Sequence, residues 1–386
     1  MNRHFLRDIA DIQTGPFGSQ LHKEDYVDIG TPIVTVEHLG NRVFTEQNLP
    51  KVSDEDKARL SKYVLKEGDI VFSRVGSVDR CSYVDAAHDG WMFSGRCLRV
   101  RPNTEVDPLY LYYFFCLEDT KQFVRNIAVG ATMPSINTKL LGEVEVAYPS
   151  QTEQQKIVAL LSALDDKIEI NQKINDNLQQ QAAALFANFY DQAEIEVGFT
   201  EMIQILGGGT PKTGESSYWN GDIPFFTPKD VGFPYTLTTE KTITEEGLAH
   251  CNSRLYPINT VFVTARGTVG KVGLPGVPMA MNQSCYALVG KDTHQLLVYF
   301  YTLKAVDRLK HKASGAVFDA ITTRDFEAEN IMKLSDDDTK AFLDVAEPIY
   351  QAVLNNSIEN LRLSELRDSL LPKLMNGEID VTDIRL

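Results

Sequence analysis

The stretch QTEQQKIVALLSALDDKIEINQKINDNLQQQAAALFANFYDQ, residues 151–192, decides the fold of this chain. From residue 157 onward, apolar side chains and two asparagines recur at alternating steps of four and three residues. That spacing is typical of a coiled-coil seam, so the stretch predicts one long helix of roughly 55 Å. The seam positions are Ile157, Leu161, Leu164, Ile168, Asn171, Asn175, Leu178, Ala182, Leu185 and Phe189.

A second helix with the same pattern is predicted near the C-terminus, 185 residues further on. Pro149-Ser150 and Ser335-Asp336 are suitable starts for the two helices. Both seams carry two asparagines at the same positions, and a buried asparagine fixes the register of a coiled coil. We therefore expect an antiparallel pair of helices in which Asn171, Asn175, Asn356 and Asn360 cluster. The second seam consists of Phe342, Ala346, Ile349, Val353, Asn356, Asn360, Leu363, Arg367, Leu370 and Leu374.

The repeat extends over nearly the whole chain. DIVFSRVGSV (residues 69–78) matches TVFVTARGTV (260–269), and GPFG (15–18) matches GGTP (208–211). PIVT at 32–35 likewise matches PFFT at 224–227, and the order of the matches is the same in both halves. The repeat predicts a pseudo-two-fold molecule in which two similar domains alternate with two long helices.

The segments between the helices contain short β-branched and aromatic runs separated by Gly and Pro, which read as strands. One further helix is expected near residues 108–125, with a mate near 296–312. The predicted fold class is α+β, with two repeated α/β domains and an antiparallel coiled coil. The predicted divisions are a first domain at 1–150, a central helix at 151–192, a second domain at 193–334, and a C-terminal helix with its tail at 335–386.

Composition narrows the class of protein. The chain has 386 residues, which favours two or more domains, and a net charge of −15. The two helical segments carry −9 of that charge, so the two domains could still present local basic faces to nucleic acid. Five scattered cysteines without a CxxC pair argue for a reducing compartment and against a zinc site. No long apolar run or signal peptide is evident, so a cytoplasmic protein without a membrane partner is expected.

Catalytic motifs are not matched. Gly207-Gly208-Gly209 resembles a glycine loop for S-adenosylmethionine, but the chain lacks the Asn/Asp-Pro-Pro-Tyr/Phe loop of amino-methylating enzymes. ARGTVGKV, residues 265–272, ends like a P-loop but has Ala and Val at two required positions. The seven His residues show no metal-ligand spacing. We therefore expect a non-catalytic protein with no cofactor and no metal.

Residues of the types that contact nucleic acid lie in loops beside strand ends. Guanine is read by Arg or Lys and adenine by Asn or Gln, and other polar groups hold phosphates. The repeat pairs Arg80 with Lys271, which favours both as phosphate contacts. The candidates in the first half are Ser19, Gln20, Lys23, His38, Arg74 and Arg80, and those in the second are Lys212, Lys229, Arg266, Lys271, Asn282 and Gln283.

Three motifs resemble the specificity (S) subunit of type I restriction–modification systems. They are LLPKLMNGEI at residues 370–379, PSQTEQQKI at 149–157 and GPFGS at 15–19. The resemblance covers essentially the whole chain, although SDDD at 335–338 departs from the Gln-rich start of the first helix. It implies two target recognition domains, each reading one half of a bipartite site in double-stranded DNA. It further implies that the helices bind two methyltransferase (M) subunits and help recruit restriction (R) subunits, and that the partner makes N6-methyladenine.

Two alternatives remain at this stage. A standalone DNA methyltransferase is disfavoured by the missing base-gripping loop, and methyl transfer by the purified chain would revive it. A structural adaptor built on the acidic coiled coil, with no DNA role, would not support sequence-dependent methylation.

The tail EIDV, residues 378–381, repeats EIEV at 194–197 but has no third domain to enter. Its alternating apolar residues suit a short edge strand or a bound extended segment on the first domain.

Overall fold

The computed structural model describes residues 1–382 apart from 17, 19, 104, 233 and 313–319. Contacts divide the chain into two compact units. The first unit comprises Met1–Asp166 with Leu363–Leu386, and the second comprises Lys167–Arg362. Each unit thus contains a part of each long helix.

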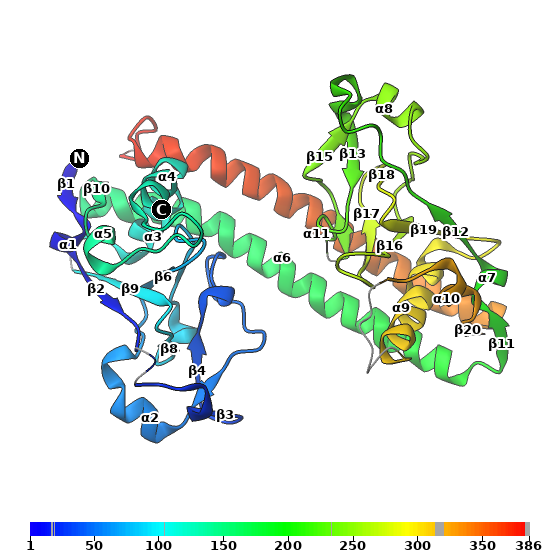
Figure 1. The fold of residues 1–386 in the computed structure, drawn as a ribbon, viewed down its shortest axis with the longest axis horizontal. Helices are drawn as coiled ribbons and strands as arrows, with labels where there is room; N and C mark the ends of the chain where they lie inside the picture. Colours follow the sequence, from blue (N-terminus) through cyan, green and yellow to red (C-terminus); the bar gives the residue numbers. More distant parts are fainter. Residues whose placement is uncertain (17, 19, 104, 233, 313–319, 383–386) are drawn as a thin grey trace. The chain divides into compact units, whose positions relative to one another are not determined.

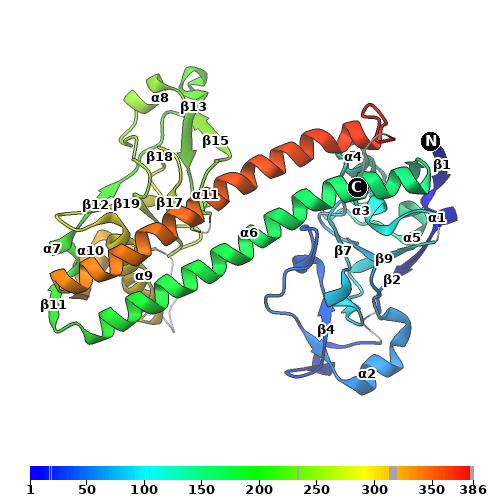
Figure 2. The same cartoon turned by 180° about the vertical axis from the view of Figure 1, so that it is seen from behind.

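Both predicted long helices are confirmed, as α6 (Gln151–Gln192) and α11 (Asp336–Met375). Each begins after a serine: the backbone amide of Asp338 donates to Ser335 Oγ at 3.1 Å, and Ser150 and Glu153 pair similarly at the start of α6. All twenty predicted seam positions are buried or half-buried. Figures 1 and 2 show α6 (green) beside α11 (orange to red).

The helix pair is antiparallel within each unit. In the second unit, Asn171 contacts Asn360 while Asn175 contacts Asn356. In the first unit, Arg367 Nη1 donates to Asp165 Oδ1 at 2.6 Å. The buried face is wider than the predicted seam, because Phe186 and Tyr350 lie beside it and pack into the domain core.

The first unit contains three sheets, with strand orders β1-β10, β2-β9-β6-β7 and β3-β5-β4-β8. The four-stranded β2-β9-β6-β7 sheet is antiparallel throughout and packs against helices α3 and α4. The elements are β1 (Asn2–Phe5), α1 (Leu6–Ile9), β2 (Ala10–Thr14), β3 (Tyr26–Val27), β4 (Thr31–Val34), β5 (Lys51–Val52), α2 (Asp54–Arg59), β6 (Ile70–Ser73), β7 (Cys81–Tyr83), β8 (Met92–Phe93), β9 (Cys97–Pro102), α3 (Pro108–Cys116), α4 (Glu118–Ile127), α5 (Thr138–Leu141) and β10 (Glu145–Tyr148).

The second unit repeats this order, with sheets β11-β20, β12-β19-β16-β17-β14 and β15-β13-β18. The equivalence follows from register, because Ser73 pairs with Cys97 in one unit and Thr264 with Cys285 in the other. The elements are β11 (Ile195–Gly198), α7 (Phe199–Met202), β12 (Ile203–Gly207), β13 (Trp219–Phe226), β14 (Tyr235–Thr236), β15 (Lys241–Ile243), α8 (Glu245–Ala249), β16 (Val261–Thr264), β17 (Val272–Pro275), β18 (Ala280–Met281), β19 (Cys285–Gly290), α9 (Gln295–Lys312), α10 (Thr323–Glu327) and β20 (Asn330–Lys333).

Each unit has two parts with separate cores. We name the part that packs on the long helices the body, and the part that contains β4, β5 and β8 in the first unit, or β13, β15 and β18 in the second, the distal lobe. In the first unit, the body core lies between the long helices, α3 and the β2-β9-β6-β7 sheet, and a second core lies among β4, β5 and β8. In the second unit, two small clusters around Phe226 and Ile223 form the distal lobe. Among the residues that the structure describes, no helix is long and apolar enough to cross a membrane.

Two sequence-based predictions need correction. The helix expected at residues 108–125 is interrupted at Leu117, whose extended backbone separates α3 from α4, whereas its mate α9 is continuous. The tail does not form an edge strand. The place that β11 takes beside β20 is taken in the first unit by β1 beside β10.

The tail instead binds the first unit without strand pairing, as the alternative prediction of a bound segment allowed. Gly377, with φ of +79°, turns the chain after α11. Val381 is then buried in the core of the first unit, and Lys156 Nζ donates to the carbonyl of Thr382 at 2.5 Å.

Candidate nucleic-acid interface

Four loops meet at one edge of the β2-β9-β6-β7 sheet. They are residues 15–20, 74–77, 94–97 and 128–135, which we name the tip loops of the first unit. The ends of β2 and β6 lie beside the start of β9, because Thr14 pairs with Leu98 and Ser73 with Cys97. Sheet pairing therefore brings together three loops that lie far apart in the sequence, and the bridge between Val75 and Ser135 adds the fourth.

Backbone hydrogen bonds join these loops to one another. Gly15 N donates to Cys97 O at 3.2 Å, and Arg74 N donates to Arg96 O at 2.8 Å. Gly76 N donates to Pro134 O at 2.8 Å and fixes the fourth loop. Since each tip loop is bonded to a neighbour, the described residues of the loops are held at a common junction.

The second unit has the equivalent tip loops 208–213, 265–268 and 282–285. Gly209 N donates to Met281 O at 3.1 Å, and Ala265 N donates to Ser284 O at 2.8 Å. The equivalent of the fourth loop falls mostly on residues 313–319, outside the described part of the chain. Ile321 N nevertheless donates to Ala265 O at 2.9 Å, as Ile136 N does to Arg74 O.

Glycine is required at two points of this arrangement in each unit. A Cβ atom on Gly15 would collide with the carbonyl oxygen of Ser94, and one on Gly208 would collide with that of Asn282. Gly76 and Gly267 turn the chain after β6 and β16 with φ of +75° and +80°, which side chains rarely adopt. Matched glycines in the two halves thus build the same loop junction.

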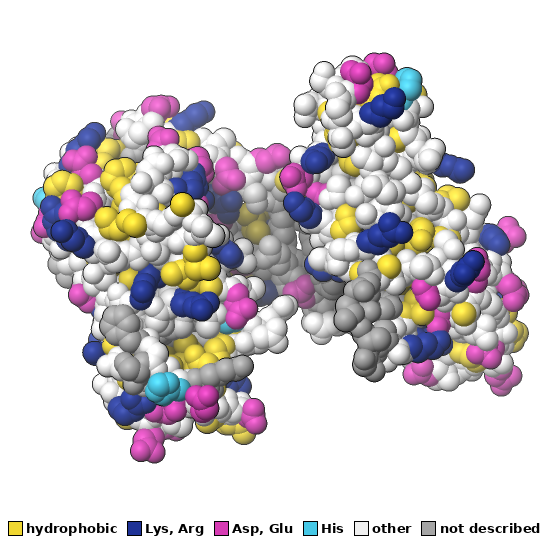
Figure 3. Space-filling model, viewed as in Figure 1, with side chains coloured by type: hydrophobic (Ala, Val, Ile, Leu, Met, Phe, Trp, Pro, Cys, Tyr) yellow, Lys and Arg dark blue, Asp and Glu magenta, His cyan; other side chains and the backbone are white. Residues whose placement is uncertain are grey.

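The tip loops are free of acidic residues in a chain whose net charge is −15. Those of the first unit contain Arg74 and Arg96, and those of the second contain Lys212 and Arg266, with no Asp or Glu. Elsewhere the signs are mixed: Figure 3 shows Lys and Arg interspersed with Asp and Glu on the viewed face. A cationic, acid-free loop edge is a suitable surface for phosphates and base edges.

Two of the residues predicted to contact DNA, Arg74 and Gln20, lie in the tip loops of the first unit. Arg74 is half-buried, and its Nη1 donates to Gly95 O at 3.0 Å. Gln20 accepts a hydrogen bond from Tyr63 at 2.7 Å. Arg80 follows the second loop, and its guanidinium donates to the carbonyl of Leu39. Lys23 begins the turn η1 (Lys23–Asp25), and Ser19 lies outside the described residues.

His38 is not placed as a DNA contact. Its side chain is 1% exposed, and Nδ1 accepts a hydrogen bond from Thr35 N at 3.0 Å. Its Nε2 lies 3.0 Å from Gln47 O and donates to it. The ring caps the turn η2 (Val36–His38), so the interpretation of His38 as a base or phosphate contact is withdrawn.

All six predicted residues of the second unit lie in or next to its tip loops. Gln283 is exposed and accepts from Thr210, and Asn282 Oδ1 accepts from Ser284 N at 3.0 Å. Lys229 is next to the 265–268 loop, since Thr268 Oγ1 donates to Pro228 O at 3.1 Å. The exposed cations of this group are Lys212, Lys229, Arg266 and Lys271.

The two arginines suggested for base reading occupy different positions. Strand register aligns Arg74 with Ala265, which is buried, and Arg266 with Val75. Arg80 and Lys271 are equivalent, as predicted. Arg96, exposed in the loop before β9, was missed by the sequence analysis. The signal was available, because that loop matches Asn282-Gln283-Ser284 once Cys97 is aligned with Cys285.

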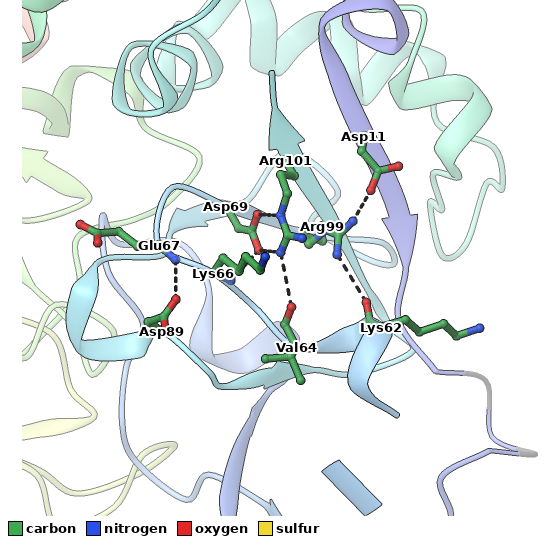
Figure 4. Close-up of polar contacts among 9 residues, drawn as sticks. All are labelled: Asp11, Lys62, Val64, Lys66, Glu67, Asp69, Asp89, Arg99 and Arg101. Carbon is green, nitrogen blue, oxygen red and sulfur yellow. Dashed lines mark hydrogen bonds and ion pairs between the residues drawn. The ribbon is translucent and has the colours of Figure 1, made fainter. Parts of the chain in front are cut away.

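A partly buried ionic network joins β2, β9 and Asp69, the residue before β6, in the first unit (Figure 4). Arg101 Nε and Nη2 donate to the two oxygens of Asp69 at 2.6 and 2.7 Å. Arg99 donates to Asp11 and to the carbonyl of Lys62, and Arg101 also reaches Val64 O. The hydrogen bond to Asp69 raises the pKa of Arg101, whereas burial and then Arg101 lower the pKa of Arg99.

This network joins β9 of the body to the segment that leads into the distal lobe. The second unit has Thr260, Ala287 and Val289 at the positions of Asp69, Arg99 and Arg101, as the strand registers show. Its corresponding turn is closed by Thr260 Oγ1, which donates to Pro257 O at 2.8 Å. Equivalent backbone positions are therefore stabilised by ion pairs in the first unit and by a hydroxyl hydrogen bond in the second.

The loops before β9 and β19 each end on a buried thiol. Burial raises the pKa of Cys97 and of Cys285 to about 12, so both remain protonated at neutral pH. Cys97 Sγ contacts Val34 O at 3.9 Å, which links the tip to β4 of the distal lobe. These thiols pack and do not supply a nucleophile.

The four seam asparagines cluster as predicted. Asn171 Nδ2 donates to Asn360 Oδ1 at 2.8 Å, and Asn356 Nδ2 donates to Asn175 Oδ1 at 2.8 Å. Asn171 and Asn175 are buried, whereas their partners are half-buried. Each pair matches an amide donor to an amide acceptor, so the polar groups in the seam are satisfied.

The two apparent cofactor motifs have other structural roles. Residues 265–271 form the turn between strands β16 and β17, whereas a P-loop leads into a helix. Gly207 ends β12, and Gly208 packs on the loop before β19. Within the described ranges, no three His, Cys, Asp or Glu side chains are grouped to hold a metal ion.

The model of the "Type I restriction modification DNA specificity domain" family matches residues 2–180 and 195–333. The chain belongs to this family. A specificity subunit of a type I restriction enzyme, HindI of Haemophilus influenzae, is 25% identical over 84% of this chain and 89% of its own length. The MjaIX specificity subunit of Methanocaldococcus jannaschii is 23% identical over 98% of this chain and 93% of its own length.

Solved structures support the same fold. The crystal structure of a type I restriction–modification S subunit from M. genitalium superposes with a TM-score of 0.57 at 16% identity. The alignment covers 97% of this chain and 95% of that one. The family's fold therefore accounts for the specificity domains and for both long helices.

Proposed function

We propose that the chain is the DNA-reading specificity subunit of a type I restriction–modification complex. Residues 1–150 and 193–334 act as two target recognition domains, and each reads one half of a bipartite site in double-stranded DNA. The supporting observation is the duplicated set of tip loops, which carry cations but no acidic residue in a strongly acidic chain.

The segments at 151–192 and 335–386 serve, in this proposal, as the scaffold for two methyltransferase subunits and for restriction subunits. Catalysis belongs to those partners, and the chain contributes recognition. A cytoplasmic location follows, because the complex acts on intracellular DNA.

A domain exchange tests the division of labour. Residues 1–150 are replaced by the equivalent domain of a relative, the hybrid is expressed with the methyltransferase partner, and methylated motifs are mapped by sequencing. We expect one half of the bipartite motif to change and the other to persist. A change in both halves, or in neither, would show that the two domains do not read separately.

A single substitution tests the loop assignment. Arg266→Ala removes an exposed guanidinium from the second tip, and a lost base contact of roughly 1–3 kcal/mol would lower methylation efficiency by about 5–150-fold. Lys333→Ala, an exposed cation on β20, is the matched control and should have little effect. Equal losses in the two variants would indicate a nonspecific charge effect.

A further inference from the structure

The fourth tip loop of the first unit presents two large apolar side chains to solvent. Val129 is 63% exposed and Met133 is 67% exposed. Exposed apolar side chains that occur singly need no explanation, but these two lie on one short hairpin. Their position in the proposed interface gives them a specific candidate ligand.

The hairpin backbone is fixed by its own hydrogen bonds. Val129 N donates to Ser135 O at 2.9 Å, and Ser135 N donates to Val129 O at 2.8 Å. Gly130 has φ of +110°, and a Cβ there would lie 2.7 Å from the carbonyl oxygen of Met133. The turn is therefore tight and specific to glycine, and it fixes the backbone from which both side chains project.

The hairpin is also bonded to the arginine-bearing loops. Gly76 N donates to Pro134 O at 2.8 Å, Ile136 N donates to Arg74 O at 2.9 Å, and Arg74 in turn bonds to the Arg96 carbonyl. Residues 74–77, 94–97 and 128–135 contain two arginines and no acidic residue. An anionic ligand held by Arg74 and Arg96 would thus be brought next to Val129 and Met133.

DNA offers few apolar groups to a protein that approaches its major groove. The C5 methyl group of thymine is the one that base-edge readout uses, and apolar side chains are its partners. We propose that Val129 and Met133 contact thymine methyl groups in the half-site read by the first domain. This inference rests on the proposed function, and it adds a hydrophobic specificity element to the polar contacts.

The test is a double-mutant cycle in which a protein side chain and a thymine methyl group are removed separately and together. The complete complex with its methyltransferase partner is assayed on duplexes in which each thymine of the mapped half-site is replaced in turn by deoxyuridine. For the unmodified chain, loss of one contacted methyl should lower methylation efficiency by about fourfold, the effect of burying one methyl-sized group. Met133→Ala or Val129→Ala should show a similar loss with thymine and no further loss with deoxyuridine at that position.

Two internal controls accompany this cycle. Deoxyuridine in the other half-site should act independently of both substitutions, because the second domain reads it. Ile195→Ala removes an exposed apolar side chain on β11 and should not alter the response to deoxyuridine. Thermal melting of each variant verifies folding, which alanine at exposed positions should preserve.

Three results would overturn the inference. The variants could respond to every deoxyuridine as the unmodified chain does, or they could lower methylation equally on all sequences. They could also fail to bind the methyltransferase subunit, which would identify a protein partner for the hairpin. In the first of these cases, sequence-specific methylation by the complex would persist, so the proposed function would stand while the thymine contact fell.

Discussion

Replacing seam asparagines singly and in pairs should give strongly non-additive changes in stability. In Asn171→Leu, the Oδ1 atom of Asn360 loses the donor that lies 2.8 Å away, within a seam where Asn171 is 1% exposed. Leaving a buried polar group without its partner costs about 1–3 kcal/mol. Asn360→Leu should cost less, because Asn171 Nδ2 keeps its hydrogen bond to Glu359 Oε2 at 2.7 Å and Asn360 is half-buried.

The double variant removes both amides and fills the seam with apolar side chains. Replacing both partners of a buried hydrogen bond is nearly neutral or stabilising, so the two losses should largely cancel. The expected coupling energy is about 1–3 kcal/mol. For a unit of this size, a destabilisation of 2 kcal/mol lowers the melting temperature by roughly 4–8 °C.

Calorimetric melting of the full chain measures this cycle. Asn188→Leu is the control, since Asn188 is exposed on the same helix and accepts a hydrogen bond from its neighbour Gln192 at 3.0 Å. Its melting temperature should stay close to that of the unmodified chain. If the effects of Asn171→Leu and Asn360→Leu simply add, the paired-amide account of the seam is wrong. Leucine at all four asparagine positions should raise the melting temperature above that of the unmodified chain.

Three other predictions concern stability and connectivity. Arg101→Met leaves the carboxylate of Asp69 buried without its cation and should lower the free energy of unfolding of the first unit by about 3–5 kcal/mol. Arg3→Met, which breaks the exposed pair with Glu145, is the control and should change the free energy of unfolding by less than about 1 kcal/mol. A denaturant titration measures both values. Hydrogen bonds from Ser150 lower the pKa of Glu153 below its ordinary value of 4.5, so the carboxylate stabilises the start of α6 at neutral pH, and this contribution is lost as the pH falls through the lowered pKa. In Glu153→Gln, the melting temperature should therefore change less between neutral and acidic pH than it does in the unmodified chain. An unchanged dependence on pH would contradict the assignment. Joining Leu386 to Met1 and opening the chain after Gln192 should preserve folding and methylation specificity, because a Cβ atom placed on Gly377 would lie 3.5 Å from Met1 Cε. An insoluble or inactive permutant would refute this connectivity.

The helices were predictable because they depend on a local pattern. A seam written at steps of four and three residues specifies which face is buried, and Ser150 and Ser335 mark where each helix begins. The clustering of the four asparagines followed from the same pattern once the repeat implied an antiparallel arrangement, whereas the pairing of Asn171 with Asn360 came from the structure. Long-range geometry was thus predictable where the sequence repeats its own periodicity.

The loop chemistry was less predictable, because it depends on strand register. Arg74 and Arg266 occur in matching sequence segments, yet a shift of one residue gives them different environments. His38 is a residue type that often contacts DNA from loops, but only the fold shows that its ring caps the turn η2. Arg96 was missed because its loop, Ser94-Gly95-Arg96, has no residue identical to its aligned counterpart in Asn282-Gln283-Ser284, although the alignment of Cys97 with Cys285 relates the two loops.

The tail shows a different limit. EIDV at residues 378–381 repeats EIEV at 194–197, and a sequence match alone predicts the same structure for both. In the first unit, however, β1 already pairs with β10 and leaves no equivalent strand position for the tail. Occupancy by another part of the chain cannot be read from a local repeat.

The composition of the first unit has a consequence for biosynthesis. Leu371, Leu374, Met375 and Val381 belong to the same core as Leu6 and Ile9, although almost the entire chain separates them in the order of translation. At about 5–20 residues per second, the ribosome needs roughly 10–40 s between completing residue 166 and reaching residue 363. The second unit, which is continuous in sequence, can close its core during that interval, while the unit synthesised first stays unfinished and open to chaperones. A nonsense mutation in the last turns of α11 should therefore unfold the N-terminal domain and leave the second unit largely intact.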